Sequence, residues 1–575
     1  MVRSKVYILA GLIVAGFLLV VLRLAYFQII NRDEFLAYIE KQYKAREKVI
    51  LPRGTIYDRN GRILSISVPT IDIFAVTRYI KDRHTLAREL SRIINVPYPV
   101  LIRKLSSGKN YVVLATGIDK SLKERLLNLR RQLEEWNLGI IESSRRYYPL
   151  NQIGGTTIGF VSKVTGKGME GLELKYDKKL GGGTGDIYLM KDALGNPFTI
   201  EKNISSEETF DIKLTIDSNI QYIAETVLAE FVRERRPKEA LILIVDPNDG
   251  RIIANATYPN YNPNRYWKYR SHRNITFHSA YEPGSLAKPF ILAETVDEGR
   301  IDLNKEYYCG EGKIIVDGIR IRDHKKFKYL TPEDIIVFSS NVGAIEIALK
   351  LDPEKMYRKL HTLGFGSSTK TFPGEASGIL RDDKRPVEIA YAAIGQNWTA
   401  TAIQIAMAYS AIANGGYLLK PRFVEEFINR ETGEIIKPEK EVIGRVLSEK
   451  SVRILQEVLK MVVERGTARK GKSEYFTIAG KTGTAQKYDP AIKALSTEKY
   501  YTWFAGYFPA EKPKFTVVIF ANEPQKIKKW ERIGGGSVSA PVLKKLVNRI
   551  MFYYKEKPDK NGNGGQNGNQ NPQRN

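Results

Sequence analysis

The sequence predicts an α+β multidomain protein: a single N-terminal transmembrane helix, a mostly β pedestal domain, and a C-terminal domain with an antiparallel sheet flanked by helices. Three observations support this. The chain has 575 residues, more than one ordinary hydrophobic core serves. An uncharged apolar run stands at the N-terminus, and alternating strand and amphipathic-helix patterns begin near residue 211. The predicted segments are a tail (1–5), an anchor (6–30), the pedestal (31–210), the C-terminal domain (211–552) and a disordered tail (553–575).

The N-terminal run VYILAGLIVAGFLLVVL, residues 6–22, carries no charge and continues to residue 30 with only Arg23 and Gln28 as polar interruptions. About 20 residues span a bilayer, whereas a signal-peptide core has about 7–15 and precedes a small-residue cleavage site, which is not evident here. Arg3 and Lys5 precede the run, so the positive-inside rule places the short tail in the cytoplasm. We expect an uncleaved single-pass anchor in the cytoplasmic (inner) membrane with an extracytoplasmic catalytic domain; a cleaved signal peptide is the alternative.

The pedestal region mixes several local patterns. Residues 31–50 are polar with helical spacing and predict a stalk. The pair Asn60-Gly61 between alternating apolar runs predicts a β-hairpin with a type I′ turn. Residues 80–142 show helical patterns. The glycine-rich segment 166–185 does not follow a strand with nucleotide-binding spacing, so it predicts a short helix between tight turns rather than a phosphate-binding loop.

The C-terminal domain begins with a strand and an amphipathic helix in KLTIDSNIQYIAETVLAEFVRE. The run ALILIVDPNDGRIIANATYP predicts a β-hairpin around Asn248, Asp249 and Gly250. A helical middle follows, and two further strands, WFAGYFPA and KFTVVIFANEP, close the domain. The end of the chain, residues 560–575, lacks apolar residues and is expected to be disordered.

The net charge is +26, and strongly basic chains often contact nucleic acid or anionic lipid. Zinc-ligand spacing, an aromatic RNA-binding signature and a basic heptad region are all missing from the sequence, so we expect no nucleic-acid partner. A basic, solvated exterior is the simpler interpretation of the charge. The one cysteine, Cys309, can form neither an intrachain disulfide nor a cysteine-based metal site, and it predicts a small buried hydrophobic side chain.

The stretch YEPGSLAKPFILAETVDEG places Ser285 three residues before Lys288. On a helix this spacing puts both side chains on one face, and Pro289 is tolerated only near the first turn, so a helix should start at about Ser285. Its N-terminal field and partial burial would lower the pKa of Lys288, letting the neutral amine accept the serine proton. Alone, the S-x-x-K spacing arises often by chance.

Two further stretches strengthen the case that the S-x-x-K spacing is functional. VFSSNVGAIEIALKL puts Ser339 and Asn341 at the entrance to an apolar helix, where an N-cap is the simpler interpretation. In YFTIAGKTGTAQKY a strand runs into residues 481–484, Lys-Thr-Gly-Thr, which offer a cation and hydroxyls to a substrate carboxylate; a turn with a surface lysine is the simpler interpretation. Gly483 would leave room for close approach. The order S-x-x-K, S-x-N, K-T-G is a signature of penicillin-binding proteins and serine β-lactamases.

With these motifs the chain resembles a class B penicillin-binding protein, and the resemblance runs from the anchor to about residue 550. RGTIYDRNG and GMEGLELKYDKKLGGGTG resemble the family's pedestal motifs. FPGEASG, QIAMAYSAIANGG and AGKTGTAQK resemble the cell-division, FtsI-like branch more than the elongation-type branch. The resemblance implies a C-terminal penicillin-binding transpeptidase fold and a serine-type D-Ala-D-Ala transpeptidase. Such an enzyme cross-links peptidoglycan stem peptides during septal cell-wall synthesis and is acylated by β-lactams.

The resemblance also implies roles for the motif residues. Ser285 would attack the penultimate D-Ala carbonyl, with Lys288 as the base. Ser339 would relay a proton to the leaving amine, and Asn341 would hold the donor peptide and Lys288. The donor's terminal carboxylate would be bound by Lys481, Thr482 and Thr484, and the oxyanion by the backbone N–H groups of Ser285 and Thr484.

The implied partners are stem peptides, lipid-linked nascent glycan, β-lactams, the membrane, an FtsW-type polymerase and other division proteins. No metal and no organic cofactor are implied.

Other functions fit the sequence less well or remain open. A Ser-His-Asp hydrolase would have a G-x-S-x-G elbow, and Ser285 lacks the second glycine. A β-lactamase would usually be a lone domain without anchor and pedestal. A D,D-carboxypeptidase differs only in using water to release the acyl group. An elongation-type paralogue, or a non-catalytic division scaffold or β-lactam sensor, also remains open.

Overall fold

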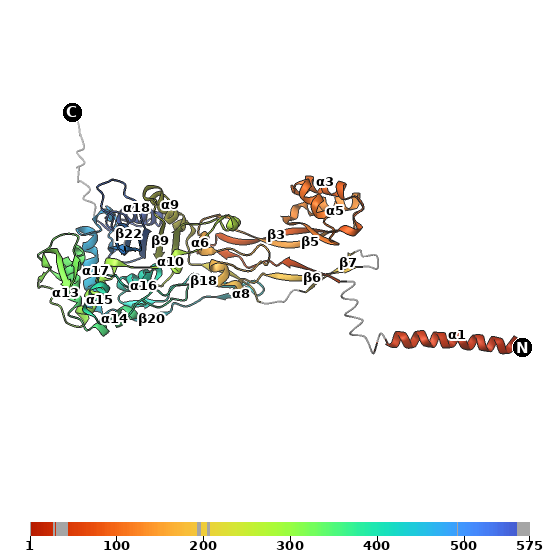
Figure 1. Ribbon diagram of the computed structural model, residues 1–575, viewed down its shortest axis with the longest axis horizontal. Helices are drawn as coiled ribbons and strands as arrows, with labels where there is room; N and C mark the ends of the chain where they lie inside the picture. Colours follow the sequence, from red (N-terminus) through yellow and green to blue (C-terminus); the bar gives the residue numbers. More distant parts are fainter. Residues whose placement is uncertain are drawn as a thin grey trace, which may run out of the picture.

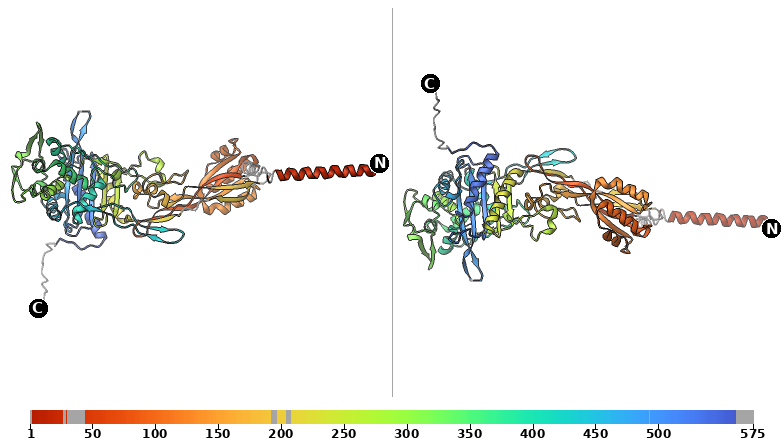
Figure 2. Two further views of the ribbon diagram at one scale, coloured as in Figure 1. Left: turned by 90° about the horizontal axis from the view of Figure 1, so that it is seen from below. Right: turned by 90° about the horizontal axis from the view of Figure 1, so that it is seen from above.

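The computed structural model describes residues 2–26, 29, 44–191, 197–203, 208–491 and 493–560. The molecule is elongated, with helix α1 at one end, the pedestal in the middle and the C-terminal domain at the other end (Figure 1). Two further views show the same arrangement in line (Figure 2). The C-terminal domain therefore stands at the end of the molecule opposite α1.

Helix α1 spans Val2–Ala25, and its segment Tyr7–Ala25 is long and apolar enough to cross a bilayer. The predicted anchor is thus a helix over these residues; residues 27, 28 and 30 lie outside the described residues, as do residues 31–43 of the predicted stalk. The helical prediction is wrong for the end of the stalk. Strand β1, Lys44–Ile50, pairs antiparallel with β6, Thr184–Lys191. A partner so distant in the chain leaves no trace in the local pattern.

The pedestal contains, besides β1 and β6, the strands β2 (Ile56–Tyr57), β3 (Ile63–Val76), β4 (Tyr111–Asp119), β5 (Leu138–Tyr147) and β7 (Pro197–Asn203), and the helices α3 (Arg83–Ile94), α4 (Tyr98–Leu105) and α5 (Lys123–Gln132). Strands β3, β4 and β5 pack with these three helices around a core of their own (Figure 1). Strand β3 pairs with both β4 and β5, while β1, β6 and β7 form a separate three-stranded sheet. The pedestal is therefore mixed α/β. The helical patterns of residues 80–142 form α3, α4 and α5, but the same range also contains β4 and the start of β5, which the helical prediction missed.

The predicted hairpin at Asn60-Gly61 exists, but its turn is not type I′. Strands β2 and β3 are joined by a five-residue loop, and of this pair only Gly61 has a positive φ, +83°. Asp58 sets the wider loop, because its side-chain Oδ1 accepts hydrogen bonds from the backbone N–H groups of Asn60 and Arg62, both at 2.8 Å. An acidic side chain that caps the loop from inside takes the place of the tight turn.

The glycine-rich segment forms short helices between turns, as predicted. These are α7 (Gly171–Lys175) and α8 (Asp177–Leu180), preceded in the chain by α6 (Gly155–Ile158). Gly181, Gly182 and Gly183 all have positive φ and end α8. The segment thus turns the chain back toward β6.

The two large parts of the molecule share a sheet. Strand β8, Phe210–Leu214, pairs parallel with β2 of the pedestal and antiparallel with β18, Val424–Asn429. The predicted boundary at 210/211 therefore falls inside a strand. The main hydrophobic core also continues across it, from Ile56 and Leu64 to Leu546.

The C-terminal domain has a five-stranded antiparallel sheet in the order β10-β9-β23-β22-β21. Helices α9 and α18 cover one face and α16 and α17 the other (Figure 1). The bounds are β9 Glu239–Val245, β10 Ile252–Tyr258, β21 Ala479–Asp489, β22 Ala494–Phe508, β23 Phe515–Asn522, α9 Ser218–Arg235, α16 Ala402–Ala413, α17 Glu449–Glu464 and α18 Ala540–Tyr553. The pairing of β9 with β10 confirms the hairpin predicted around Asp249.

A helical subdomain fills the middle of this region, as predicted. Its helices are α10 (Ile275–His278), α11 (Lys288–Asp297), α12 (Pro332–Val337), α13 (Asn341–Ala348), α14 (Pro353–Thr362) and α15 (Pro386–Ala393). Short strands lie between these helices: β11 (Ala280–Tyr281), β12 (Tyr307–Tyr308), β13 (Lys313–Val316), β14 (Ile319–Arg322) and β15 (Tyr329–Leu330). Four more short strands follow α15: β16 (Ala400–Thr401), β17 (Tyr417–Leu419), β19 (Ile435–Ile436), which pairs with β18, and β20 (Val442–Arg445). Cys309 is fully buried here, and burial raises the pKa of its thiol to about 11, in keeping with an inert hydrophobic residue.

The chain stays ordered slightly beyond the predicted start of the tail. Tyr553 ends α18, and the Lys560 side chain donates to Glu464 at 2.6 Å and to the Ser473 carbonyl at 3.0 Å. The pairing of Lys560 with α17 explains the difference from the composition-based boundary at 553. Residues 561–575 lie outside the described residues.

Candidate active site

Ser285 lies in a 3₁₀ turn, Gly284–Leu286, that leads directly into α11. Helix α11 starts at Lys288, so the predicted helix start near Ser285 is correct to within one turn. The Ser285 side chain is partly exposed, and among the described residues neither its hydroxyl nor its backbone N–H makes a hydrogen bond. Both groups are therefore free to meet a ligand.

Glycines fix this turn against the edge strand β21. A Cβ on Gly483 would lie 2.5 Å from the Pro283 carbonyl oxygen, and one on Gly284, whose φ is +57°, would lie 2.7 Å from the Thr484 carbonyl oxygen. The Gly284 N–H donates to the Gly395 carbonyl at 2.9 Å. Gly483 was expected to leave room for a substrate. Here its missing side chain leaves room for the serine turn itself.

Lys288 is wholly buried at the start of α11. Its Nζ contacts Asn341 Oδ1 at 2.7 Å, the Ser339 carbonyl at 2.8 Å and Ser339 Oγ at 3.3 Å. Burial lowers the pKa of Lys288 from 10.5 to about 7, against a smaller raising effect of Asp323. A large fraction of the amine is therefore neutral near pH 7.

The three residues of the S-x-N motif have different structural roles. Ser340, the middle residue, is the N-cap of α13, with its Oγ accepting from the Gly343 N–H at 2.9 Å. Ser339 has a positive φ of +62°, a strained backbone for a serine. Because Ser340 caps the helix, the side chains of Ser339 and Asn341 remain available to Lys288.

Lys481 on β21 also contacts Ser339. It is wholly buried, and its Nζ lies 2.9 Å from Ser339 Oγ and 3.1 Å from the Thr482 carbonyl oxygen. Burial and then the charge of Lys288 lower its pKa well below the usual value. The hydroxyl of Ser339 is thus shared by two buried lysines.

The two threonines of the K-T-G-T run contact protein groups. Thr482 Oγ1 lies 2.7 Å from Thr467 Oγ1, and Thr484 Oγ1 accepts from the Gly535 N–H at 2.9 Å. Thr482 is almost fully buried, whereas Thr484 is partly exposed. The structure thus gathers the S-x-x-K, S-x-N and K-T-G motifs at one place, although they come from three separate elements.

Two residues that lie beside this site, Asp323 and His324, were not identified from the sequence. Asp323 caps α13 by accepting from the backbone N–H groups of Asn341 and Val342 and from the hydroxyl of Ser340. The pKa of His324 is lowered, first by desolvation and then by Lys288. Both residues lie in the charged segment RDHKKF, residues 322–327. Such a segment predicts only a solvent-exposed loop, so no local pattern indicates that they lie at the site.

Chemically, the arrangement provides a serine, two lysines biased toward the neutral form, and bridging polar groups. A neutral lysine can take a proton that a histidine takes in other serine enzymes. Within the described part of the chain no group of three or more His, Cys, Asp or Glu residues is placed to hold a metal ion. The site therefore points to acyl transfer through a serine.

Comparison with known families agrees. The model of the penicillin-binding protein transpeptidase domain matches residues 240–548, and that of the penicillin-binding protein dimerisation domain matches residues 48–214. The chain belongs to the class B penicillin-binding proteins. It is thus a member of a serine-type D,D-transpeptidase family, with a dimerisation domain as the pedestal and an N-terminal helix apolar enough for a membrane anchor.

Individual relatives cover nearly the whole chain. The probable peptidoglycan D,D-transpeptidase PenA of Neisseria meningitidis is 31% identical over 86% of this chain and 83% of its own. Stage V sporulation protein D of Bacillus subtilis is 28% identical over 97% and 87%, and the peptidoglycan D,D-transpeptidase FtsI of Escherichia coli is 27% identical over 96% and 92%. The crystal structure of penicillin binding protein 2X from Streptococcus thermophilus shares the fold, with a TM-score of 0.75 at 24% identity over 88% of this chain and 80% of that one.

We expect Gly483→Ala to slow acylation by a penicillin at least about 100-fold, because its Cβ would displace the Ser285 turn and misplacement by about 1 Å can cost that much. Gly444→Ala is the matched control, since a Cβ there meets nothing within 4 Å and Gly444 also lies in a strand, β20. Acylation rates and melting temperatures of both variants check this. A folded Gly483→Ala protein that acylates at the wild-type rate would contradict the packing role.

Proposed function

We propose that this class B penicillin-binding protein cross-links peptidoglycan stem peptides through an acyl-enzyme on Ser285. The observation that carries the proposal is the buried Lys288, one helical turn after Ser285, with a pKa of about 7 and its Nζ held by Ser339 and Asn341. A buried amine that is partly neutral near pH 7 suits a general base.

In the acylation step, Ser285 Oγ attacks the carbonyl carbon of the penultimate D-Ala and Lys288 takes the hydroxyl proton. The free N–H of Ser285, with an N–H of the edge strand β21 at Thr484, would bind the oxyanion. When the intermediate collapses, the C–N bond breaks and the proton passes through Ser339 to the leaving D-Ala amine. Ser339 suits this relay because its hydroxyl contacts both lysines.

In the second step, the amine of another stem peptide attacks the ester and forms a new amide. Its proton returns through the same groups to Ser285 Oγ as the ester bond breaks. A water molecule in place of the amine would give a carboxypeptidase. The partly exposed position of Ser285 admits either acceptor, so the product distinguishes the two reactions.

Lys481, with Thr482 and Thr484, would bind the terminal carboxylate of the donor. Its pKa is well below the usual value in the empty site because burial disfavours the charged form. A bound carboxylate would favour the protonated form and raise that pKa again. Substrate binding would therefore charge Lys481 while Lys288 stays the base.

The first prediction concerns the nucleophile and the product. Full-length protein, supplied with lipid-linked glycan and a polymerase, should give cross-linked muropeptides, and penicillin should form an adduct on Ser285. Ser285→Ala should stay folded and do neither, because the acyl-enzyme cannot form. Mass spectrometry that places the adduct on Ser339, or digestion products that are only trimmed, would overturn the proposal.

The second prediction concerns pH. If neutral Lys288 is the base and its pKa is about 7, the acylation rate should reach a plateau above about pH 8 and lie about 100-fold below that plateau at pH 5. Lys288→Arg should be nearly as inactive as Lys288→Ala, because arginine does not deprotonate in proteins. Substantial acylation by the arginine variant would mean that the lysine acts only as a charge.

We also propose that α1 is a single-pass anchor with residues 1–5 in the cytoplasm and the catalytic domain outside. The support is the apolar segment Tyr7–Ala25 together with Arg3 and Lys5 before it. With this topology the anchor and the pedestal could contact an FtsW-type polymerase, which lies in the same membrane. The active site would then face the side on which the lipid-linked nascent glycan is made. Protease protection of the C-terminal domain in right-side-out vesicles would contradict this orientation.

The division branch is proposed on the resemblance of FPGEASG, QIAMAYSAIANGG and AGKTGTAQK to FtsI-like proteins. Depletion of the protein should then produce undivided filaments of normal width, because septal cross-linking stops while the lateral wall still grows. Rounded or widened cells would assign it to elongation. Normal vegetative growth would argue for a specialised role, of the kind that the name of the sporulation relative suggests for that protein.

A further inference from the structure

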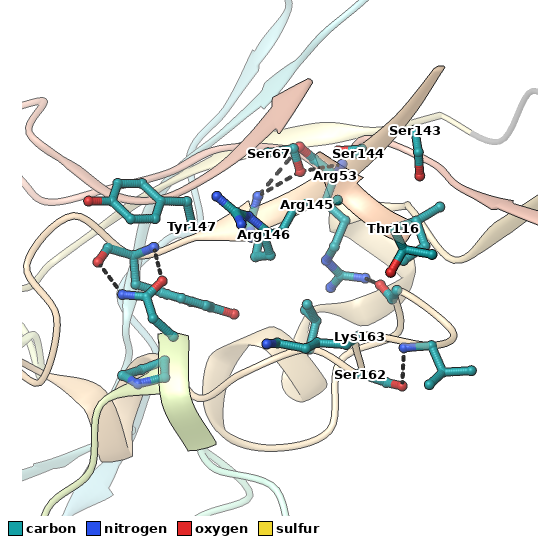
Figure 3. A pocket seen from close by; sticks show the side chains of 18 of the residues that line it. Arg53, Ser67, Thr116, Ser143, Ser144, Arg145, Arg146, Tyr147, Ser162 and Lys163 are labelled. Carbon is teal, nitrogen blue, oxygen red and sulfur yellow. Dashed lines mark hydrogen bonds between the residues drawn. The ribbon is translucent and has the colours of Figure 1, made fainter. Parts of the chain in front are cut away.

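A cavity of about 670 Å³ lies at the junction of the pedestal and the C-terminal domain (Figure 3). Its walls come from residues 50–53 at the end of β1, from β3, β4 and β5, from the loops at residues 148–151 and 161–166, and from the start of η4, Pro263–Lys268. None of the three catalytic motifs lines it. Its volume is within the range of small-molecule sites, so it is large enough for an organic ligand.

The wall of this cavity is strongly basic. Five lining residues are Arg or Lys, and one, Asp72, is acidic. Two of the five, Arg53 and Arg146, are structural: their Nε atoms lie 3.1 Å and 2.7 Å from the carboxylate of fully buried Glu173. Burial alone would raise the pKa of Glu173, but the two arginines lower it, so the cluster holds a charged triad.

The other three cations are not held by a salt bridge. Arg145, Lys163 and Arg265 form no ion pair within 4 Å among the residues that the structure describes. Hydrogen bonds to its carboxylate and, to a smaller extent, the charge of Arg145 do lower the pKa of Asp119. Lys163 Nζ lies 3.3 Å from the ring centroid of Trp267. The pKa of Lys163 is lowered by burial and by Arg145, so these two cations repel each other across the cavity wall. A bound anion would relieve this repulsion.

Polar groups with unused hydrogen-bonding capacity accompany these cations. Arg146 is buried, and its Nη2 has no hydrogen-bond partner in the described part of the chain. The hydroxyls of Thr116, Ser143 and Ser144, which also line the cavity, form no hydrogen bonds with described residues. A buried guanidinium N–H without a partner costs free energy unless a ligand or water satisfies it.

We propose that this junction cavity binds an anionic glycan segment of peptidoglycan, at a site separate from the active site. This inference rests on the proposed function for the identity of the glycan. Arg145, Lys163 and Arg265 would bind stem-peptide carboxylates, and the free hydroxyls and Arg146 Nη2 would bind sugar hydroxyls. Because the lining comes from both the pedestal and η4, a bound strand would contact both domains.

The mixture of groups favours a glycan over an acidic peptide. A carbohydrate presents many neutral hydroxyls and few charges, which matches three free hydroxyls and three tyrosine side chains beside the cations. The tyrosines Tyr147, Tyr148 and Tyr266 line the same cavity. An acidic peptide would need mainly cations and would leave the hydroxyls unpaired.

The experiment measures binding of a disaccharide pentapeptide to full-length protein whose active site has first been acylated by penicillin. Acylation leaves the cavity as the free site and independently tests the Ser285 assignment. We expect Arg145→Glu/Lys163→Glu to weaken binding at least about 10-fold while acylation stays at the wild-type rate. Arg145→Gln/Lys163→Gln should give a smaller loss, because it removes the attraction without adding repulsion.

The matched control is Arg88→Glu/Arg125→Glu. These arginines lie on α3 and α5 of the pedestal, are exposed, and do not line the cavity. This variant makes the same change in net charge and should bind the muropeptide within about 2-fold of wild type. Equal losses in both double variants would show a non-specific charge effect and overturn the site.

Other outcomes also decide the matter. If the acylated wild type fails to bind the muropeptide, the inference is wrong although the proposed function stands. A muropeptide with amidated carboxylates should bind more weakly, and inorganic phosphate should compete only weakly. If a poly-glutamate peptide binds as tightly as the muropeptide, the cavity is a protein-docking site and the glycan assignment must be abandoned. If penicillin does not acylate the protein, the proposed function itself fails.

Discussion

The structure of the active site depends on the burial of two lysines around one serine hydroxyl. Lys288 and Lys481 are both inaccessible to solvent, and both contact Ser339 Oγ. Burial lowers the pKa of both lysines because it disfavours their charged forms, and the charge of Lys288 lowers the pKa of Lys481 further. Only a large enclosing core can keep them there. The helices and the sheet of the C-terminal domain therefore do more than stabilise the fold: their packing lowers the pKa of the Lys288 amine to about 7.

Backbone contacts set where Lys288 lies relative to the Ser285 turn. Gly284 and Gly483 let the serine turn and the edge strand β21 approach within a distance that no Cβ would permit. Asp323 and Ser340 cap α13, which frees Ser339 and Asn341 for Lys288. Ser285 itself remains without a hydrogen bond among the described residues. The frame therefore fixes the position of the serine turn and leaves the serine side chain free.

The pedestal is joined to the catalytic domain more closely than a linker would join them. Strand β8 belongs to a sheet that contains strands of both parts, and one hydrophobic core runs across the junction. The buried Arg53–Glu173–Arg146 cluster holds the pedestal side of this junction together. The cavity beside it is therefore placed where an occupant would contact both domains, and no residue of the S-x-x-K, S-x-N and K-T-G motifs lines it.

The sequence alone determined the elements that depend on local pattern and spacing. The apolar run predicted α1, the alternation around Asp249 predicted the β9–β10 hairpin, and the order of the three motifs predicted which residues meet at the site. It failed where a distant partner decides the structure. Strand β1 forms because β6 pairs with it, Gly483 matters because Pro283 packs against it, and Asp323 caps a helix that starts 18 residues later in the chain. The pKa of Lys288 and the unpaired cations around the junction cavity likewise follow from burial and from charges brought together in space, which only the tertiary structure decides, because no local pattern records them.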